Sequence, residues 1–196
     1  FANDNIRIID SMPVPVCKFA RAYFSKSFKD IASYGYCASK KETYFGLKLH
    51  ALVTVDGFVS DFLLTPAGID DRTAVFELTE NKQSIKIIAD KGYIDNTLKN
   101  QLEIEKDILL ISLKRKNSKH PLEKRLRNVL SKTRRRVETS FSQLSEQFNI
   151  NKVLAKSKWG LMFRITLKIL AHNISFIINH ILGNGKIAQI KQLVFG

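Results

Sequence analysis

The chain has 196 residues, 44% of them hydrophobic, which is enough to bury the core of one ordinary domain and excludes a disordered chain. It carries 32 Lys and Arg against 18 Asp and Glu, and the net charge of +14 predicts a polyanionic partner such as nucleic acid. Cys17 and Cys37 are too few for a disulfide framework or a four-ligand zinc site. We therefore expect a reducing, cytoplasmic compartment, and the first residues show no secretory leader.

The first predicted element is a short strand over residues 6–9, an apolar run that ends at Asp10. Pro13 and Pro15 follow closely and are expected to break it. Residues 11–45 are aromatic and basic without a clean period, so we expect an irregular insertion there.

A β-hairpin is predicted next. Asp56-Gly57 separates two runs rich in β-branched and aromatic residues, 44–55 and 58–65. An Asp-Gly pair between such runs is a strong local signal for two antiparallel strands.

Helices and strands then alternate. Asp70-Asp71 and Asp95 stand in front of segments with helical apolar periodicity, as helix-capping residues do. The predicted elements are a helix to Glu80, a strand over 85–89, a helix from 95 to 105, a strand over 108–113 and a long helix over 126–148. The sum predicts an α/β fold with a mixed sheet of about five strands and helices on both faces.

The positive charge is confined to the second half of the chain. Residues 1–98 hold 12 basic and 12 acidic residues, whereas residues 99–196 hold 20 basic and 6 acidic. The density is highest over 114–136, a basic loop and helix in which 11 of 23 residues are Lys or Arg. The alternative is that these side chains only form a solvated helix face. However, neighbouring positive charges repel one another unless an anion lies across them, so a nucleic-acid phosphate backbone is favoured as the partner. The candidate DNA-binding residues are Lys114, Arg115, Lys116, Lys119, Arg134, Arg135 and Arg136.

The most apolar segment, residues 159–182, carries one polar stripe at helical spacing. The stripe consists of Arg164, Lys168, His172, Ser175 and Asn179. A bilayer span would not tolerate charges facing lipid, so no membrane is predicted. We expect a helix packed on a sheet or a partner with its polar stripe in water, and His172 and His180 as ordinary helix members.

Three carboxylates are candidates for chemistry. Asp10 and Asp90 each end a buried type of strand, and parallel neighbours would place them roughly 5 Å apart at one sheet edge. Such a pair repels unless a cation lies between its members, and Mg²⁺ prefers oxygen ligands. Glu138 lies beside the apolar stripe of the long helix and could be a third ligand, or could only pair with Arg134 one turn earlier.

Other polar residues have plainer explanations. Helix capping accounts for Asp70, Asp71 and Asp95, and His50 lies in an apolar strand where a core or hydrogen-bonded histidine is expected. Ser112 and Ser140 lack a His or Cys partner at suggestive spacing, so no nucleophilic triad is predicted.

Four segments, in this order, carry a resemblance to a known family: IIDSMPVPVC, YFGLKLHALVTVDGFVSDFLLTPAGIDDR, IIADKGY and RRRVETSFSQL. Together they resemble the catalytic core of bacterial insertion-sequence transposases of the DDE type, most closely insertion-sequence family 982, over about residues 6–178. The family's three acidic positions fall on Asp10, Asp90 and Glu138. Its Arg four residues before the Glu is matched by Arg134, but Ser131 and Ser145 stand where related transposases have Tyr and Lys.

The resemblance implies a ribonuclease H-like catalytic domain over residues 1–182, a tail over 183–196, and two Mg²⁺ or Mn²⁺ ions held by the three carboxylates. It implies cleavage at transposon ends and joining to target DNA, with double-stranded DNA and a second copy of the chain as partners, near the nucleoid. The family's N-terminal DNA-binding region precedes the first Asp and is not in this sequence, so recognition of specific ends is not expected from it.

Two other functions stay open at this stage. A non-catalytic or decayed nucleic-acid-binding fragment would bind DNA without cutting it. Another ribonuclease H-like nuclease, such as a junction resolvase or an RNA:DNA hydrolase, would hydrolyse nucleic acid but would not join a 3′ end to new DNA.

Overall fold

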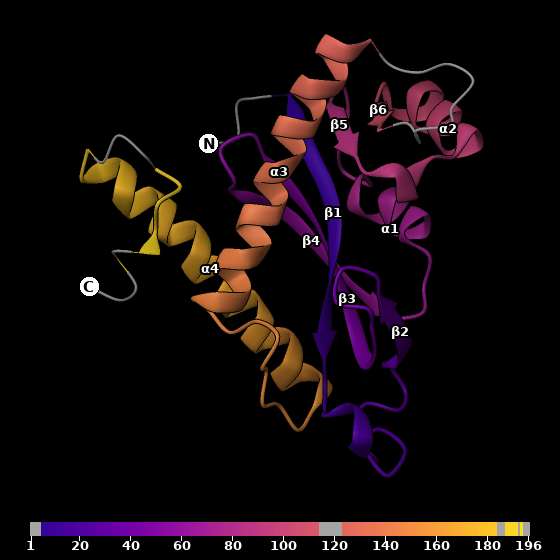
Figure 1. Ribbon diagram of the computed structural model, residues 1–196, viewed down its shortest axis with the longest axis vertical. Helices are drawn as coiled ribbons and strands as arrows, with labels where there is room; N and C mark the ends of the chain where they lie inside the picture. Colours follow the sequence, from indigo (N-terminus) through magenta and orange to yellow (C-terminus); the bar gives the residue numbers. More distant parts are fainter. Residues whose placement is uncertain (1–4, 114–122, 184–186, 192, 194–196) are drawn as a thin grey trace. The chain divides into compact units, whose positions relative to one another are not determined.

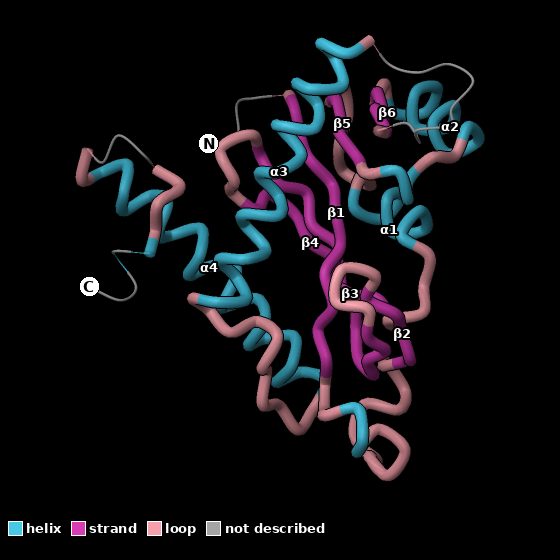
Figure 2. Tube along the Cα trace, in the orientation of Figure 1, coloured by secondary structure: helices cyan, strands magenta, loops and turns pink. Residues whose placement is uncertain are grey.

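The computed structural model describes residues 5–113, 123–183, 187–191 and 193 (Figure 1). The chain forms six strands and four α-helices in the described residues, with two short 3-10 helices between them (Figure 2). The elements are β1 (Ile6–Pro15), η1 (Phe19–Arg21), β2 (Ser33–Cys37), β3 (Glu42–Thr54), β4 (Val59–Pro66), α1 (Asp71–Leu78), β5 (Lys86–Ala89), η2 (Lys91–Tyr93), α2 (Asn96–Lys106), β6 (Leu109–Ser112), α3 (Lys124–Glu146) and α4 (Lys158–Ile181).

The strands form one mixed sheet. Its order is β2-β3-β1-β5-β6, and β4 pairs with β3. β1 with β5 and β5 with β6 are parallel pairs, whereas β2 and β3 are antiparallel. The prediction of a mixed α/β fold is confirmed, with six strands in the described sheet in place of about five.

The chain divides into two compact units. The first contains residues 1–10, 51–63 and 70–140, and the second contains residues 11–50, 64–69 and 141–196. Each unit is described by itself below.

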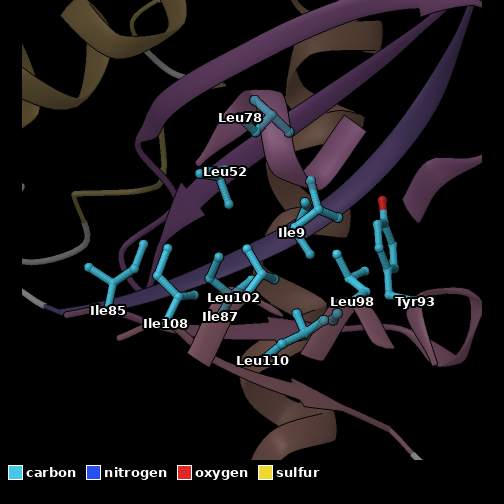
Figure 3. Close-up of a cluster of buried hydrophobic side chains, with 12 residues drawn as sticks. Ile9, Leu52, Leu78, Ile85, Ile87, Tyr93, Leu98, Leu102, Ile108 and Leu110 are labelled. Atoms are coloured by element: carbon cyan, nitrogen blue, oxygen red, sulfur yellow. The ribbon is translucent and has the colours of Figure 1, made fainter. Parts of the chain in front are cut away.

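The core of the first unit follows from the alternation of side chains along β5. Ile87 and Ala89 point to one face, into a cluster with Leu78 of α1 and Leu102 of α2 (Figure 3). Ile88 points to the other face and packs with α3. Helices therefore cover both faces of this part of the sheet, as predicted, because a parallel strand buried on both sides needs apolar cover on both.

Several predicted elements are confirmed by their local chemistry. Gly57 adopts a φ of 105°, which suits glycine, in the turn between β3 and β4. The side chain of Asp70 accepts a hydrogen bond from the backbone N–H of Arg72 and caps α1. Asp95 caps α2 in the same way, accepting from two backbone N–H groups.

The predicted end of the first strand is wrong, because β1 continues through Pro13 to Pro15. Successive residues of a strand present their N–H groups to opposite neighbours. The N–H of Val16 donates to the carbonyl of Phe45 on β3, so Pro13 and Pro15 present their missing N–H groups to the other side. On that side β5 pairs with β1 only as far as Ile9, and no ladder hydrogen bond is lost.

The predicted irregular insertion over residues 11–45 is also wrong. It contains the end of β1, all of β2 and the start of β3. β2 and β3 pair antiparallel, with Tyr34 opposite Phe45. Gly46 permits this packing, because a Cβ atom there would overlap the carbonyl oxygen of Val14. Aromatic side chains on a solvent-facing strand hid the period-2 pattern, since Tyr34 and Tyr36 are both exposed.

Helix α3 confirms the predicted amphipathic helix. Leu130, Val137, Phe141 and Leu144 are buried at spacings of three, four and seven residues. Leu126, predicted on the same stripe, is 46% exposed, so the buried stripe begins one turn later.

Three of the five residues in the polar stripe of α4 are buried, which corrects the prediction that the stripe lies in water. His172, Ser175 and Asn179 are buried in the second unit. His172 hydrogen-bonds Gln143 at 3.1 Å, and the amide of Asn179 donates to the carbonyl of Ile187 at 3.0 Å. Burial of polar groups is tolerated because each of these side chains has hydrogen-bond partners.

The two cationic members of the stripe are bonded as well. Arg164 donates to the carbonyl of Leu154, and Lys168 donates to the carbonyl of Phe148. The described part of the tail packs on the same helix, with Ile190 fully buried. The stripe therefore fastens α4 to its neighbours within the second unit.

By length and composition alone, α4 is also apolar enough to cross a membrane, and one third of its most apolar window is buried. It is the single described helix with this property.

We expect His172 to make the stability of the chain depend on pH. Burial lowers the pKa of His172 from 6.5 to about 4. The unfolded chain therefore binds the proton more tightly, so the contribution is fully present above pH 6.5 and is lost as the pH falls toward 4. The difference in unfolding free energy between wild type and His172→Gln should shrink by about 3 kcal/mol from pH 7 to pH 4.

Urea unfolding at several pH values measures this difference. His180→Gln, at an exposed position of the same helix, is the matched control and should leave the pH profile of the wild type unchanged. A constant difference between wild type and His172→Gln across this range would contradict the prediction.

Candidate active site

Strand register places two of the predicted carboxylates side by side. Ile9 of β1 is the partner of Ala89 of β5, and these strands are parallel. Asp10 and Asp90 are the next residues on each, and neighbouring strands lie about 4.8 Å apart. β5 ends at this point, so Asp90 leaves the sheet beside Asp10.

The same alternation selects the face on which the carboxylates lie. Ile6 of β1 and Ile88 of β5 pack with Leu130 of α3. Asp10 and Asp90 lie an even number of residues further along each strand, so both belong to the face that α3 covers.

Helix α3 adds the third carboxylate and a cation. Leu130, Arg134 and Glu138 follow one another at intervals of four residues, so they share one face of the helix. Because Leu130 packs on the sheet, Arg134 and Glu138 are carried along that sheet toward Asp10 and Asp90.

A single guanidinium contacts all three carboxylates. Arg134 Nη1 lies 3.4 Å from Asp10 Oδ2, Nη2 lies 2.5 Å from Glu138 Oε1, and Nε lies 3.8 Å from Asp90 Oδ1. The side chains of Arg134 and Asp10 are 20% and 23% exposed, whereas Asp90 and Glu138 are 42% and 49% exposed. The cluster is thus shielded on the sheet side and open at its rim. The structure brings together the three acidic residues that the sequence singled out.

The cluster is short of positive charge. Three carboxylates against one guanidinium leave a formal excess of two negative charges among these four side chains. The buried Nε of Arg134 has no hydrogen-bond partner, since its approach to Asp90 is an ion pair without hydrogen-bond geometry. The guanidinium therefore compensates the carboxylates incompletely.

The donor set suits a hard divalent cation by its chemistry. Carboxylate oxygens are the ligands that Mg²⁺ prefers, and an excess of two negative charges matches one such ion. Among the described residues, however, no three His, Cys, Asp or Glu side chains stand in a ready metal-binding arrangement. In this structure the cation shared by the carboxylates is Arg134.

Asp10 differs from its predicted position. It was expected at the end of a strand but lies inside β1, at the residue where the pairing with β5 has stopped. Asp90 follows β5 as expected and precedes the η2 turn, where its side chain makes no capping hydrogen bond.

The arginines of α3 have three different environments. Arg134 is engaged by the carboxylates, and Arg136 donates from Nε to the carbonyl of Val55 at 3.1 Å. Arg135 is exposed. Of the three, Arg135 is thus the side chain displayed to solvent. Four further predicted DNA-binding residues lie outside the described residues: Lys114, Arg115, Lys116 and Lys119.

The side chains of His50, Ser112 and Ser140 form hydrogen bonds within the fold. His50 is fully buried and hydrogen-bonds Thr65 at 2.8 Å. Ser140 donates to the carbonyl of Gly57. Ser112 donates to the carbonyl of Tyr93.

Sequence reasoning missed the central place of Arg134. It treated this residue as a phosphate ligand and as an i,i+4 partner of Glu138. The spacing of Leu130, Arg134 and Glu138 carried the missing signal, because a helix that buries the first residue on the sheet must aim the other two along it.

A family model described as "Transposase DDE domain" matches residues 2–158. A search among curated proteins finds no match. Among solved structures, a piggyBac transposase in a synaptic complex with hairpin DNA has a TM-score of 0.58 at 12% identity, over 97% of this chain and 51% of the other. The likeness shows a ribonuclease H-like transposase fold, and the chain spans about half the length of that protein.

We expect Arg134→Gln to destabilise the fold by about 1–2 kcal/mol at pH 7, because three carboxylates lose their shared counter-charge. Arg135→Gln, at the neighbouring exposed position, should cost less than about 0.5 kcal/mol. Urea unfolding of both variants checks the difference. Equal destabilisation would show that Arg134 does not hold the cluster together.

Proposed function

The chain belongs to the transposase DDE-domain family, and on that premise we propose that it catalyses divalent-metal-dependent cleavage at transposon ends and joining of the freed strand to target DNA. The three acidic positions of this chemistry are Asp10, Asp90 and Glu138. The order of its sequence motifs supports an insertion-sequence transposase of the family 982 type.

One observation carries the proposal. Residues 10, 90 and 138 are far apart in sequence, yet their carboxylates all contact the one guanidinium of Arg134. Bringing three like charges together disfavours folding, and a plain structural protein gains nothing from it. Clustered acidic groups on a sheet of this fold are a reason to assign catalysis to the site.

Transposases with a DDE domain generally use divalent metal ions, and the donor set described above fits such ions. Asp10, Asp90 and Glu138 would hold them, and we expect two Mg²⁺ or Mn²⁺. When bound, such ions stabilise the charge that develops on the attacking and leaving oxygens of phosphoryl transfer.

The chain's own residues have separate tasks. The carboxylates of β1, β5 and α3 supply negative charge at the shielded end of the site. Arg134 balances part of that charge and fixes the rotation of Glu138 toward the sheet. The side chain of Arg135 is exposed to solvent and can contact a DNA phosphate. Such a contact positions DNA without selecting its sequence.

We expect Asp10→Asn, Asp90→Asn and Glu138→Gln each to reduce Mg²⁺-dependent DNA cleavage at least about 100-fold while DNA binding stays within a few-fold of wild type, because a carboxamide keeps the shape but not the charge. Glu146→Gln is the matched control. This residue lies on the same helix, and its carboxylate accepts from Ser142. It should cut as the wild type does.

The substrate is a labelled duplex that carries the element's end, and a supercoiled plasmid serves as target. Cleavage followed by joining supports a transposase, whereas cleavage without joining indicates a plain nuclease. Near-normal cutting by any one of the three variants removes that residue from the site.

The exposed arginine should contribute to DNA affinity through a phosphate. Arg135→Ala is expected to weaken binding and to reduce the slope of log affinity against log salt by about 1. Arg136, whose half-buried guanidinium donates to the carbonyl of Val55, provides the control, since Arg136→Ala should leave the slope unchanged if the protein stays folded. Fluorescence anisotropy across a salt series measures both, and an unchanged slope for Arg135→Ala places this residue outside the interface.

A further inference from the structure

Five aromatic side chains are exposed over a short stretch of the second unit. Phe19, Tyr23, Phe24, Tyr34 and Tyr36 are 51–79% exposed. Over residues 18–36, which the structure describes completely, every exposed large hydrophobic side chain is aromatic. Exposed apolar groups that gather in one place on a protein surface mark an interaction site, so this stretch calls for a ligand.

Strand β2 presents two of these rings on one face. It lies at the edge of the sheet. Cys37 is buried with Ala67, and a Cβ atom at Gly35 would overlap the side chain of Ala67, so one face of β2 is closely packed. Because side chains alternate along a strand, Tyr34 and Tyr36 both lie on the opposite face. The packed face is filled by small residues, and the two tyrosines are displayed to solvent.

The first of these tyrosines is held in place by other rings. Phe19 of η1 meets Tyr34 edge-on, with ring centroids 6.0 Å apart and an interplanar angle of 76°. Tyr34 also packs against the buried ring of Phe45 at a centroid distance of 5.1 Å. The loop that carries Phe19 is anchored by the buried side chains of Ala22 and Phe28. The exposed rings are thus preorganised, which lowers the entropic cost of binding a flat ligand.

Positive charge accompanies the rings. Four exposed cationic residues lie among them in the sequence, Lys18, Arg21, Lys26 and Lys29, against the single acidic residue Asp30. Residues 18–36 therefore carry a formal charge of +3, although residues 1–98 are neutral as a whole. Aromatic rings beside cations suit a ligand with flat π-faces joined by anionic links, which is the composition of a nucleic-acid strand.

The spacing of the tyrosines favours an unpaired strand. Residues 34 and 36 are two positions apart on a β-strand, which is about 6.8 Å. This is twice the rise of about 3.4 Å per base along one strand of a duplex. One base on each ring therefore needs a strand whose bases are unstacked and turned outward. Exposed aromatic side chains on β-sheets bind successive bases of single strands in this way.

We propose that Phe19, Tyr34 and Tyr36, which we call the β2 aromatic surface, bind single-stranded DNA by stacking on its bases, while Arg21 and the neighbouring lysines contact its phosphates. Stacking of this kind does not select a base sequence. A lipid surface fits less well, because the membrane-facing side of an interfacial segment usually includes aliphatic side chains such as Leu. The surface belongs to the second unit and the three carboxylates belong to the first, so the proposal does not depend on catalysis.

Fluorescence anisotropy with a labelled oligothymidylate of about twelve nucleotides tests the proposal. Tyr34→Leu combined with Tyr36→Leu keeps apolar bulk without the rings and should weaken binding at least about 10-fold. Tyr34→Phe combined with Tyr36→Phe keeps the rings and should bind within about 2-fold of wild type. Neither pair should change the slope of log affinity against log salt, since no charge is lost, whereas Arg21→Ala should reduce it by about 0.7.

The controls isolate the surface from the rest of a basic chain. Trp159→Leu removes an exposed ring from α4 and should bind the oligothymidylate as the wild type does. A blunt duplex of the same length should bind the double Leu variant and the wild type equally, because its bases offer no free faces along its length. Tyr36→Leu alone, at a 66% exposed position, should weaken binding at least about 3-fold and serves if the double variant does not fold. EDTA is present throughout, so failure of this test leaves the proposed cleavage untouched.

Four results would overturn the proposal. The first is a double Leu variant that binds the oligothymidylate as tightly as the wild type does; if that variant has instead lost binding to phosphatidylserine vesicles, the surface belongs to lipid. The second is a double Phe variant that loses as much affinity as the double Leu variant. The third is an equal loss of duplex binding, which would assign the surface to paired DNA. The fourth is tighter binding of an oligouridylate of the same length, which would assign it to RNA.

Discussion

The mutual repulsion of three carboxylates is the constraint on which the candidate site depends. Arg134 lies among Asp10, Asp90 and Glu138 and contacts all three carboxylates. One helix supplies both Glu138 and this guanidinium, so docking of α3 adds negative charge and part of its compensation in one step. The compensation is incomplete by two formal charges, which is why a site of this composition suits a divalent cation better than a closed network of ion pairs would.

Ordinary sheet geometry brings the other two carboxylates to the same place. The parallel register of β1 and β5 aligns Asp10 with Asp90, and side-chain alternation turns both toward α3. The end of β5 at Ala89 also contributes to the site, because the hydrogen-bonded pairing of β1 with β5 ends there, beside Asp10. The same stop leaves the prolines of β1 without a lost hydrogen bond. One short strand thus explains both the extended β1 and the position of the acidic pair.

Helix α4 of the second unit buries polar and apolar side chains on the same side. Its buried residues are Leu161, Ile165, Ile169, His172, Ser175, Phe176 and Asn179, and the polar ones are hydrogen-bonded, His172 to Gln143 and Asn179 to the carbonyl of Ile187. Burial among these residues lowers the pKa of His172, so its imidazole is held neutral inside the protein.

The sequence by itself determined the α/β class, the hairpin at Asp56-Gly57, the capped helices and the three acidic residues. Each is a local pattern, namely a turn dipeptide, a capping residue or a period of apolar positions, and local patterns survive without tertiary contacts. Only the tertiary structure decided that β1 passes through its prolines, because that depends on where β5 ends. It also decided that Arg134 joins the carboxylates and that the polar side of α4 turns inward. Periodicity defines the two faces of a helix, but which face is buried depends on the hydrogen-bond partners that the rest of the fold provides.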